Sequence, residues 1–407
     1  MQQRSTHLVT CLTILAALLF APCALSEDGP PNGWAQHGNT PGQPPQQPGQ
    51  DEPWAQDAAP DWVVPGARIT LYGQVANTLK KNDPQNPRIG TAGTGYQQYD
   101  IIAVTPAGVL MEYRNYVIPL NETRPQLSDV QLMLVDAASG GQLWVPRSEL
   151  QNIPVTTDPD ANPKIELAPY TIDGDTYDAI HFTRTQQNNG THTTRRVYDQ
   201  RTGLVLYQSE TLDNDEGTAI NNSEFRSYRV AQLPWHGTQY TDRVRGLDKL
   251  VYDFTSTNVT PGLPPQSIGR AVTFDLGQST ESIMQVAVSM QRHAQRGAPP
   301  MDDAASQPVE QMLCTNQRLG LYIAPDVLTQ LEDGQDLDVD PDIGYRIVVT
   351  DVYQVDGVTL VEITEHGPQN SYVSTNTYDA SVGLLVHAEQ TIPGLDMVHE
   401  SVLIAVE

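Results

Sequence analysis

Residues 198–205 read YDQRTGLV, and residues 378–385 read YDASVGLL, an offset of 180 positions. An aspartate four residues before a glycine is typical of a tight turn: the carboxylate accepts hydrogen bonds from backbone amides, and the glycine takes a left-handed conformation. The tyrosine that precedes the aspartate is expected to pack on a sheet. The same turn between strands is therefore predicted twice, and with it one fold that is used twice.

Other landmarks recur at nearly the same offset. The run LWVP at residues 143–146 corresponds to LYIAP at residues 321–325, and a short helix is expected after each. The pairs Asp173-Gly174 and Asp356-Gly357 separate alternating runs, which predicts two-residue hairpin turns with positive φ. About nine or ten short strands per copy predict an all-β protein. We expect two tandem homologous antiparallel β-meander domains, each a half-barrel or sandwich, with a few short helices.

The N-terminus has the pattern of an export signal. A basic residue, Arg4, precedes an apolar run over residues 8–20, and small residues follow at 24–26. This run is too short for a permanent membrane anchor, so no transmembrane segment is expected after signal removal. The mature protein is predicted to be extracytoplasmic, either periplasmic or secreted. A lipoprotein acylated at Cys23 is the competing interpretation, and Pro22 directly before that cysteine disfavours it.

Composition divides the rest of the chain. Residues 27–60 are rich in Pro, Gln and Gly and poor in apolar residues, which predicts a disordered linker. We expect the first β domain at residues 61–233 and the second at residues 234–407. The formal net charge is -26, with 49 acidic and 23 basic side chains. Nucleic acid is not an expected partner, because binding its phosphates needs a basic face. Neither the oligomeric state nor a particular partner can be derived from the sequence.

Cys314 is the one cysteine left after removal of residues 1–26. It stands where the first copy has Leu134, so we expect a buried thiol that packs as a small hydrophobe rather than a reactive one. Without a CxxC pair, the sequence offers no zinc or dithiol motif.

The histidines are expected to be structural. His181 corresponds to Thr364 in the second copy, so it is not part of the shared design. His387 and His399 lie on the last two predicted strands and could meet across a ladder. Tyr207 takes the place of His387 in the first copy, which favours packing over metal binding.

An alternating acidic run over residues 333–342 is the stronger of two calcium candidates, and the weaker one is the cluster of Asp213, Asp215 and Glu216. Oxygen-rich loops can bind calcium, but Pro341 replaces the glycine that an EF-hand requires. A solvated acidic loop is the alternative. The calcium candidates are Asp336, Asp338, Asp340 and Asp342. No catalytic residues and no other cofactor are predicted.

The duplicated meander resembles the bacterial lipoprotein-carrier and lipoprotein-binding proteins of the LolA, LolB and RseB type. The resemblance rests on export, repeat size, hairpin order and the Tyr-Asp-x-x-x-Gly-Leu element at 198–204 and 378–384. It implies half-barrels over an apolar cavity with short helices as a lid, which bind acyl chains or lipoproteins without chemistry. No binding residue of that family can be matched to this chain.

Three functions remain open from the sequence. The favoured one is an exported non-catalytic binding or interaction protein of the cell envelope, with an apolar ligand or an envelope protein bound on a concave sheet face. A secreted or periplasmic hydrolase that uses a carboxylate pair is the alternative. The third is a surface structural or adhesion protein. Any special site is expected where the copies differ or in the groove between them.

Overall fold

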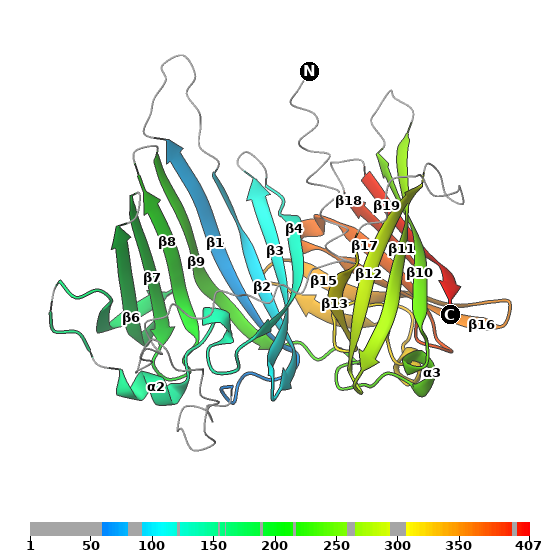
Figure 1. Cartoon of the computed structure of the whole chain (residues 1–407), viewed down its shortest axis with the longest axis horizontal. Coiled ribbons are helices and arrows are strands. Elements are labelled where there is room, and N and C mark those ends of the chain that lie inside the picture. Colours follow the sequence, from blue (N-terminus) through cyan, green and yellow to red (C-terminus); the bar gives the residue numbers. More distant parts are fainter. Residues whose placement is uncertain are drawn as a thin grey trace, which may run out of the picture.

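The computed structural model describes residues 59–79, 92–119, 123–153, 155–158, 160–187, 190–214, 217–258, 265–293, 307–392 and 397–407. The predicted signal peptide and nearly all of the predicted linker lie outside these residues. Within them, each copy forms one antiparallel sheet (Figure 1).

The first sheet has nine strands in the order β4-β3-β2-β1-β9-β8-β7-β6-β5. Its strands are β1 (Ala67–Leu79), β2 (Ala92–Thr105), β3 (Gly108–Pro119), β4 (Gln126–Val135), β5 (Lys164–Ile172), β6 (Asp175–Gln187), β7 (Thr191–Asp199), β8 (Val205–Asp213) and β9 (Gly217–Val230). A short 3-10 turn, η2 (Gly140–Gln142), and the helix α2 (Arg147–Asn152) lie between β4 and β5.

The second sheet repeats this order with one more strand, as β13-β12-β11-β10-β19-β18-β17-β16-β15-β14. Its strands are β10 (Lys249–Asn258), β11 (Gln266–Ser279), β12 (Ile283–His293), β13 (Val309–Cys314), β14 (Asp336–Asp340), β15 (Tyr345–Val355), β16 (Val358–His366), β17 (Val373–Asp379), β18 (Leu385–Ile392) and β19 (Met397–Val406). Between them lie α3 (Asp242–Arg245) before β10, α4 (Pro325–Leu328) before β14, and the 3-10 turn η3 (Pro368–Asn370).

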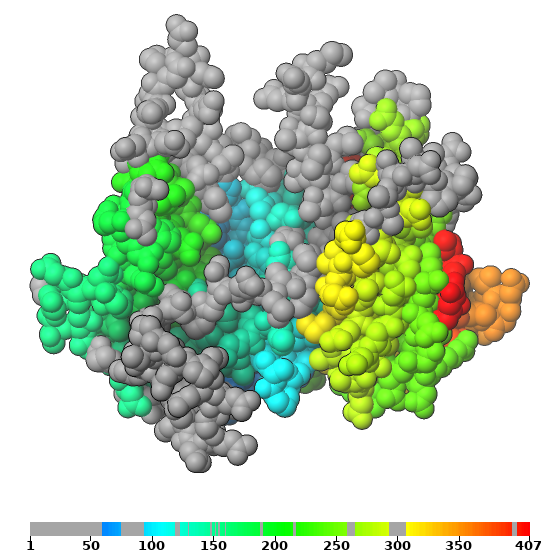
Figure 2. All heavy atoms as spheres, viewed as in Figure 1, coloured from blue at the N-terminus to red at the C-terminus, as the bar shows by residue number. Residues whose placement is uncertain are grey.

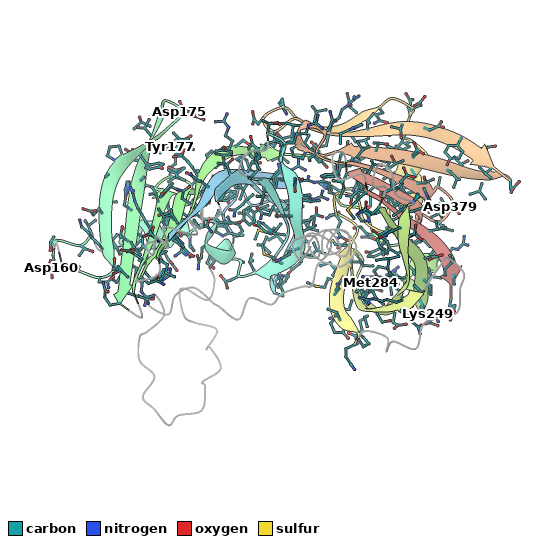
Figure 3. The ribbon with its side chains drawn as sticks, turned by 90° about the horizontal axis from the view of Figure 1, so that it is seen from above. Asp160, Asp175, Tyr177, Lys249, Met284 and Asp379 are labelled. Carbon is teal, nitrogen blue, oxygen red and sulfur yellow. The ribbon has the colours of Figure 1, made fainter. Side chains whose placement is uncertain are left out.

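The predicted all-β class and antiparallel meanders are confirmed. Each copy is one continuous curved sheet rather than a two-layer sandwich (Figure 3). Most of the acidic run that was weighed as a loop, Asp336–Asp340, is instead the extra edge strand β14, with no counterpart in the first copy, and Asp342 lies in the turn that follows. The domain bounds at residues 233 and 234 stay a prediction; Leu233 itself packs in the core of the second sheet.

The repeated Tyr-Asp-x-x-x-Gly element holds a loop onto each sheet. Asp379 accepts a hydrogen bond from the Ser381 backbone N–H at 2.8 Å, and Gly383 has a φ of 83°. The Gly383 carbonyl then accepts from the Ile323 N–H at 2.9 Å. In the first copy, the carbonyl of Gly203 accepts from Val145 in the same way, at 3.0 Å. The element is therefore a structural clamp: it ties the recurring turn to the run LWVP in the first copy and to the run LYIAP in the second.

The hairpin turns also follow the sequence. Asp173 and Gly174 have φ of 50° and 96°, and Asp356 and Gly357 have φ of 51° and 84°. Two successive positive φ values match the right-handed twist of the strands that the turns connect. These turns set the register of β5 on β6 and of β15 on β16.

The two copies meet through different faces of their sheets. Side chains alternate between faces along a strand, so Ile69 and Ile101 enter the core of the first sheet while Arg68 and Asp100 point to its other face. That outer face lies against the second copy, where Leu132 of β4 packs beside Cys314. Figures 1 and 2 show this junction, with β4 beside β13 and the cyan surface of the first copy against the yellow surface of the second.

Cys314 is buried, as expected, but it packs at the junction between the copies. Burial raises the pKa of its thiol to about 11. The thiol is therefore neutral at physiological pH, and this favours packing over nucleophilic chemistry.

The clamp predicts that a side chain at Gly383 lowers the stability of the protein. A Cβ added at Gly383 would lie 2.3 Å from the Ile323 carbonyl oxygen, whereas Gly357 has a similar φ and open space around it. Left-handed strain costs about 1–2 kcal/mol at either position. Gly383→Ala should therefore lower the free energy of unfolding in urea by clearly more than the matched Gly357→Ala. Equal losses of unfolding free energy in the two variants would contradict the role of Gly383 in the clamp.

Candidate binding site

The outer face of the first sheet carries a row of charged side chains. The strand registers place Arg229, Arg68, Asp100 and Glu112 directly opposite one another across β9, β1, β2 and β3. All four side chains therefore lie on one face, where they meet the second copy.

Three arginines and three aspartates of the two copies pair at this junction. Arg68 donates to Asp100 of its own sheet and, at 2.8 Å, to Asp338 of β14. Arg318 donates to Asp100 at 3.0 Å, and its guanidinium lies 4.5 Å from the centre of the Tyr345 ring. Arg229 pairs with Asp338 and Asp340, and Arg68 also lies 3.8 Å from Asp340. Arg68 and Arg318 are each 1% exposed, so these charges interact away from solvent screening.

The electrostatics of Asp100 follow from these contacts. Burial alone would raise the pKa of its carboxyl, but the charges of Arg318 and Arg68 and their hydrogen bonds bring the pKa well below its ordinary value. Asp100 is therefore ionised at physiological pH and holds one arginine from each copy.

A second charged group lies beside the first. Arg114 of β3 donates to Glu112 at 2.6 Å and to Glu365 of β16, in the other copy, at 2.6 Å. Glu365 also accepts from the hydroxyls of Tyr345 at 2.6 Å and Tyr372 at 3.0 Å. Burial would raise the pKa of Glu365, but Arg114, Arg318 and these hydroxyls lower it below its ordinary value.

A pocket opens next to this group, with walls from both copies. Its cavity volume is about 70 Å³. Arg114 and Leu132 of the first copy line it, together with strands β13, β16, β17, β18 and β19 of the second. The pocket therefore exists because the outer face of one sheet covers the core-facing side of the other.

The floor of the pocket is a row of polar side chains. Glu365, Ser374, Gln390 and His399 stand directly opposite one another across β16, β17, β18 and β19, and all four line the pocket. Ser256 of β10 continues the row beyond the pocket. The row shares its face with Ile363, two residues from Glu365, which belongs to the core of the second sheet. A polar row on a core-facing side is unusual and calls for hydrogen-bond partners.

Two members of the row have no such partners. Both polar atoms of the Gln390 amide and both ring nitrogens of His399 are buried without a hydrogen bond to the protein. Each residue is only 2% exposed. Burial lowers the pKa of His399 to about 4, so the ring is neutral at physiological pH and offers one donor and one acceptor. It stacks on Phe254 at 6.0 Å between ring centroids.

The first copy does not repeat this arrangement. By the strand registers, Glu210 and Asn221 take the places of Gln390 and His399 on β8 and β9. Both are exposed. The shared fold therefore provides the row in both copies, and only the second copy buries it.

The predicted calcium residues lie apart from the pocket. Asp338 and Asp340 pair with arginines of the first copy, Asp336 pairs with Arg346, and Asp342 is exposed. Across the described ranges, no group of three or more His, Cys, Asp or Glu has a metal-binding arrangement. Calcium binding here stays a prediction, and it would have to displace the arginines from the two buried carboxylates.

The histidines are placed differently from one another. His181 is half-buried, with its Nε2 3.1 Å from the Ala168 carbonyl. His387 lies 3.3 Å from Glu400 and opposite Val402, so it faces away from His399 and the two rings do not meet. His399 was expected to pack as a structural residue, and its unpaired nitrogens were not foreseen. The alternation of residues along β19 could have indicated a buried polar site, because Met397, His399 and Ser401 lie on one buried face of the strand.

Comparisons with known proteins add little. No family model matches the chain, and no curated protein does. Among solved structures, the chain is similar to MucB in complex with MucA(peri), at 10% identity over 83% of this chain and 89% of that one, with a TM-score of 0.18. It is also similar to the Pseudomonas aeruginosa MucA/MucB complex, at 12% identity over 74% and 89%, again with a TM-score of 0.18. These scores are too low to assign the chain to a family, so the family resemblance stays a proposal.

The buried junction predicts unequal effects of two matched substitutions on β14. Asp338→Asn leaves Arg68 and Arg229 without a full counter-charge, and losing one partner of a buried pair costs about 3 kcal/mol or more. Asp336→Asn removes a half-exposed pair with Arg346, which is worth about 1 kcal/mol at most. Urea unfolding of both variants tests this, and similar losses would show that the junction is not held by its charges.

His399 predicts a pH dependence of stability. Its folded pKa is about 4, whereas an unfolded histidine titrates near 6.5, so the unfolded chain takes up the proton first as the pH falls. The free energy of unfolding should drop by up to about 3 kcal/mol between pH 6.5 and pH 4. His399→Leu should lack that part of the drop in urea titrations at pH 8, 6 and 5. Parallel profiles for both proteins would contradict a buried neutral ring.

Proposed function

We propose that the protein is a non-catalytic binding protein that acts outside the cytoplasm and binds its ligand in the pocket between the two copies. One observation carries this proposal: four polar atoms of Gln390 and His399 are buried in that pocket without protein partners. An unmet buried donor or acceptor costs about 1–3 kcal/mol. Proteins keep such groups where a ligand, an ion or bound water completes them.

The contacts favour binding over hydrolysis. Glu112 and Glu365 both line the pocket, which is the carboxylate pair that a hydrolase would need. Both, however, hold Arg114 between them, and the pKa of Glu365 is lowered. Glycoside hydrolysis requires one carboxyl with a raised pKa to protonate the leaving group. Glu365 is therefore suited to positioning Arg114 and not to acting as a general acid.

The size and the lining of the pocket limit the size and the polarity of the ligand. Sites for drug-sized molecules have volumes of roughly 300–1,000 Å³, so a cavity of about 70 Å³ accommodates a small molecule or one end of a larger one. Leu132 and Met312 supply apolar walls, and the floor is polar. The hydrocarbon of an acyl chain, which the family resemblance implies as ligand, would have to cover Gln390 without pairing it. We therefore favour a polar ligand.

The location outside the cytoplasm rests on the sequence. Residues 1–26 have the pattern of an export signal, and residues 27–60 form the proposed linker between the membrane surface or cleavage site and the two domains. In the described part of the chain, no helix is long and apolar enough to cross a membrane. Cys23 would anchor the protein to lipid if it were acylated, which Pro22 disfavours.

Filling the pocket tests this function. Ala388 lines the pocket and Ala405 lies on β19 outside it, and both are half-buried. We expect a small-molecule adduct in native mass spectra of the exported wild-type protein, or thermal stabilisation by members of a mixed library of acids, amines, amides, sugars and fatty acids. Ala388→Leu should abolish either effect, and Ala405→Leu should retain it.

The proposal fails if the wild-type protein shows neither an adduct nor stabilisation by any library member. It also fails if Ala388→Leu binds as the wild type does, because the ligand site would then lie elsewhere. Stabilisation by fatty acids alone would favour the apolar ligand that we rejected.

A further inference from the structure

We propose that the ligand presents an uncharged primary amide, which pairs with the side chain of Gln390 through two hydrogen bonds beside His399. This inference rests on the proposed function and names the ligand class of the same pocket. It stands on the chemistry of the atoms left unpaired at the floor and on the charges that surround them.

The unmet hydrogen-bonding capacity of the pocket belongs to uncharged groups. Arg114 is the basic residue among the lining side chains, and Glu112 and Glu365 already bind it. Glu365 in turn accepts three hydrogen bonds, from Arg114, Tyr345 and Tyr372. Glu389 also lines the pocket, so an anionic ligand would meet three glutamates and no free arginine. A cationic ligand would have to compete with Arg114 for Glu112 and Glu365.

The hydrogen-bonding groups of the Gln390 side chain narrow the class of ligand further. Its amide offers one acceptor oxygen and a donor NH₂ next to each other, and both are unpaired. A primary amide presents the complementary pair, with its oxygen accepting and its N–H donating. A carboxylate has two acceptors and would place one against the Gln390 oxygen. An alcohol has a single oxygen and would leave one of the two atoms unpaired.

His399 completes the environment. It stands directly opposite Gln390 across β18 and β19, and it stacks on Phe254 of β10. Its neutral ring holds one donor and one acceptor, and an amide bound to Gln390 still has a second N–H and a second oxygen lone pair to offer. Glu365 and Arg114, on the same face of the sheet, pair with each other, whereas Glu389 and Glu400, the chain neighbours of Gln390 and His399, alternate to the opposite face. The site is thus uncharged where the ligand would bind.

The first copy supplies a built-in contrast. At the place of Gln390 it has Glu210, which is exposed. A carboxylate in this position has two acceptors and no donor, so it cannot form the paired hydrogen bonds with an amide. Gln390→Glu therefore converts the site to the chemistry of the first copy with nearly the same side-chain size.

The binding test uses the full exported protein and propionamide as the probe, with propionate, propylammonium and propanol as probes of matched size. We expect saturable binding of propionamide by calorimetry or ligand-observed NMR, and at least tenfold weaker binding of the other three. Gln390→Glu and Gln390→Leu should each weaken propionamide binding at least tenfold. The same substitutions at Gln354, which is exposed on the hairpin of β15 and β16, should leave it unchanged.

A second measurement needs no ligand. Replacing an unpaired buried amide by an apolar group of similar shape removes its desolvation penalty. We expect Gln390→Leu to raise the Tm of the ligand-free protein, while Gln354→Leu leaves it nearly unchanged. A lower Tm for Gln390→Leu would mean that the amide is already paired, for example by tightly held water, and would overturn the inference.

The outcomes separate this inference from the function on which it rests. If propionate, propylammonium or fatty acids bind in place of propionamide, and Ala388→Leu abolishes that binding, the pocket is a ligand site and the amide class is wrong. If no probe of any class binds, both are wrong. Propionamide binding that is insensitive to Gln390→Glu also overturns the amide pairing.

Discussion

The structure depends on arginine and carboxylate pairs buried between the two copies. Arg68 and Arg318 come from different copies, and both bind Asp100. Buried charges are expensive to leave unpaired, so each guanidinium must meet its carboxylates in a narrow range of geometries. Asp338 reaches Arg68 only if β14 lies against the outer face of the first sheet. The charges therefore fix how the copies sit on each other, and they do so with little contribution to net stability, since desolvation offsets most of their attraction.

That placement creates the pocket. Once the first sheet lies on the second, Arg114 meets Glu365 and the side chains of β3 and β4 cover the polar row on β16 to β19. The same fold thus serves two purposes. The outer face of the first copy covers the pocket of the second. In the first copy itself the equivalent row, at Glu210 and Asn221, is exposed to solvent. In the second copy the extra strand β14 supplies the attachment, and the covered row holds the atoms of Gln390 and His399 that have no protein partner.

The parts of this structure that depend on local chemistry could be predicted from the sequence. The turn of Asp379 and Gly383, the hairpin turn at Asp356-Gly357 and the antiparallel strands between them follow from backbone conformation and period-two patterning. The junction could not be reached in this way, because Arg68 and Asp338 are 270 positions apart and a charged residue in a strand reads as solvent-facing. The acidic run was read as a loop or a calcium site for that reason. His399 was set aside together with His387, whose place in the first copy is taken by Tyr207, although a special site was expected where the copies differ or in the groove between them.

A crystal structure of the wild-type protein soaked in propionamide, at a resolution that shows bound water, tests the central claim most directly. The account predicts density for the amide between Gln390 and His399, with two hydrogen bonds to the Gln390 side chain and the copies joined through Arg68, Arg318 and Asp100. Gln390 and His399 paired with protein groups or fixed water in the soaked crystal, with no amide bound, would contradict it.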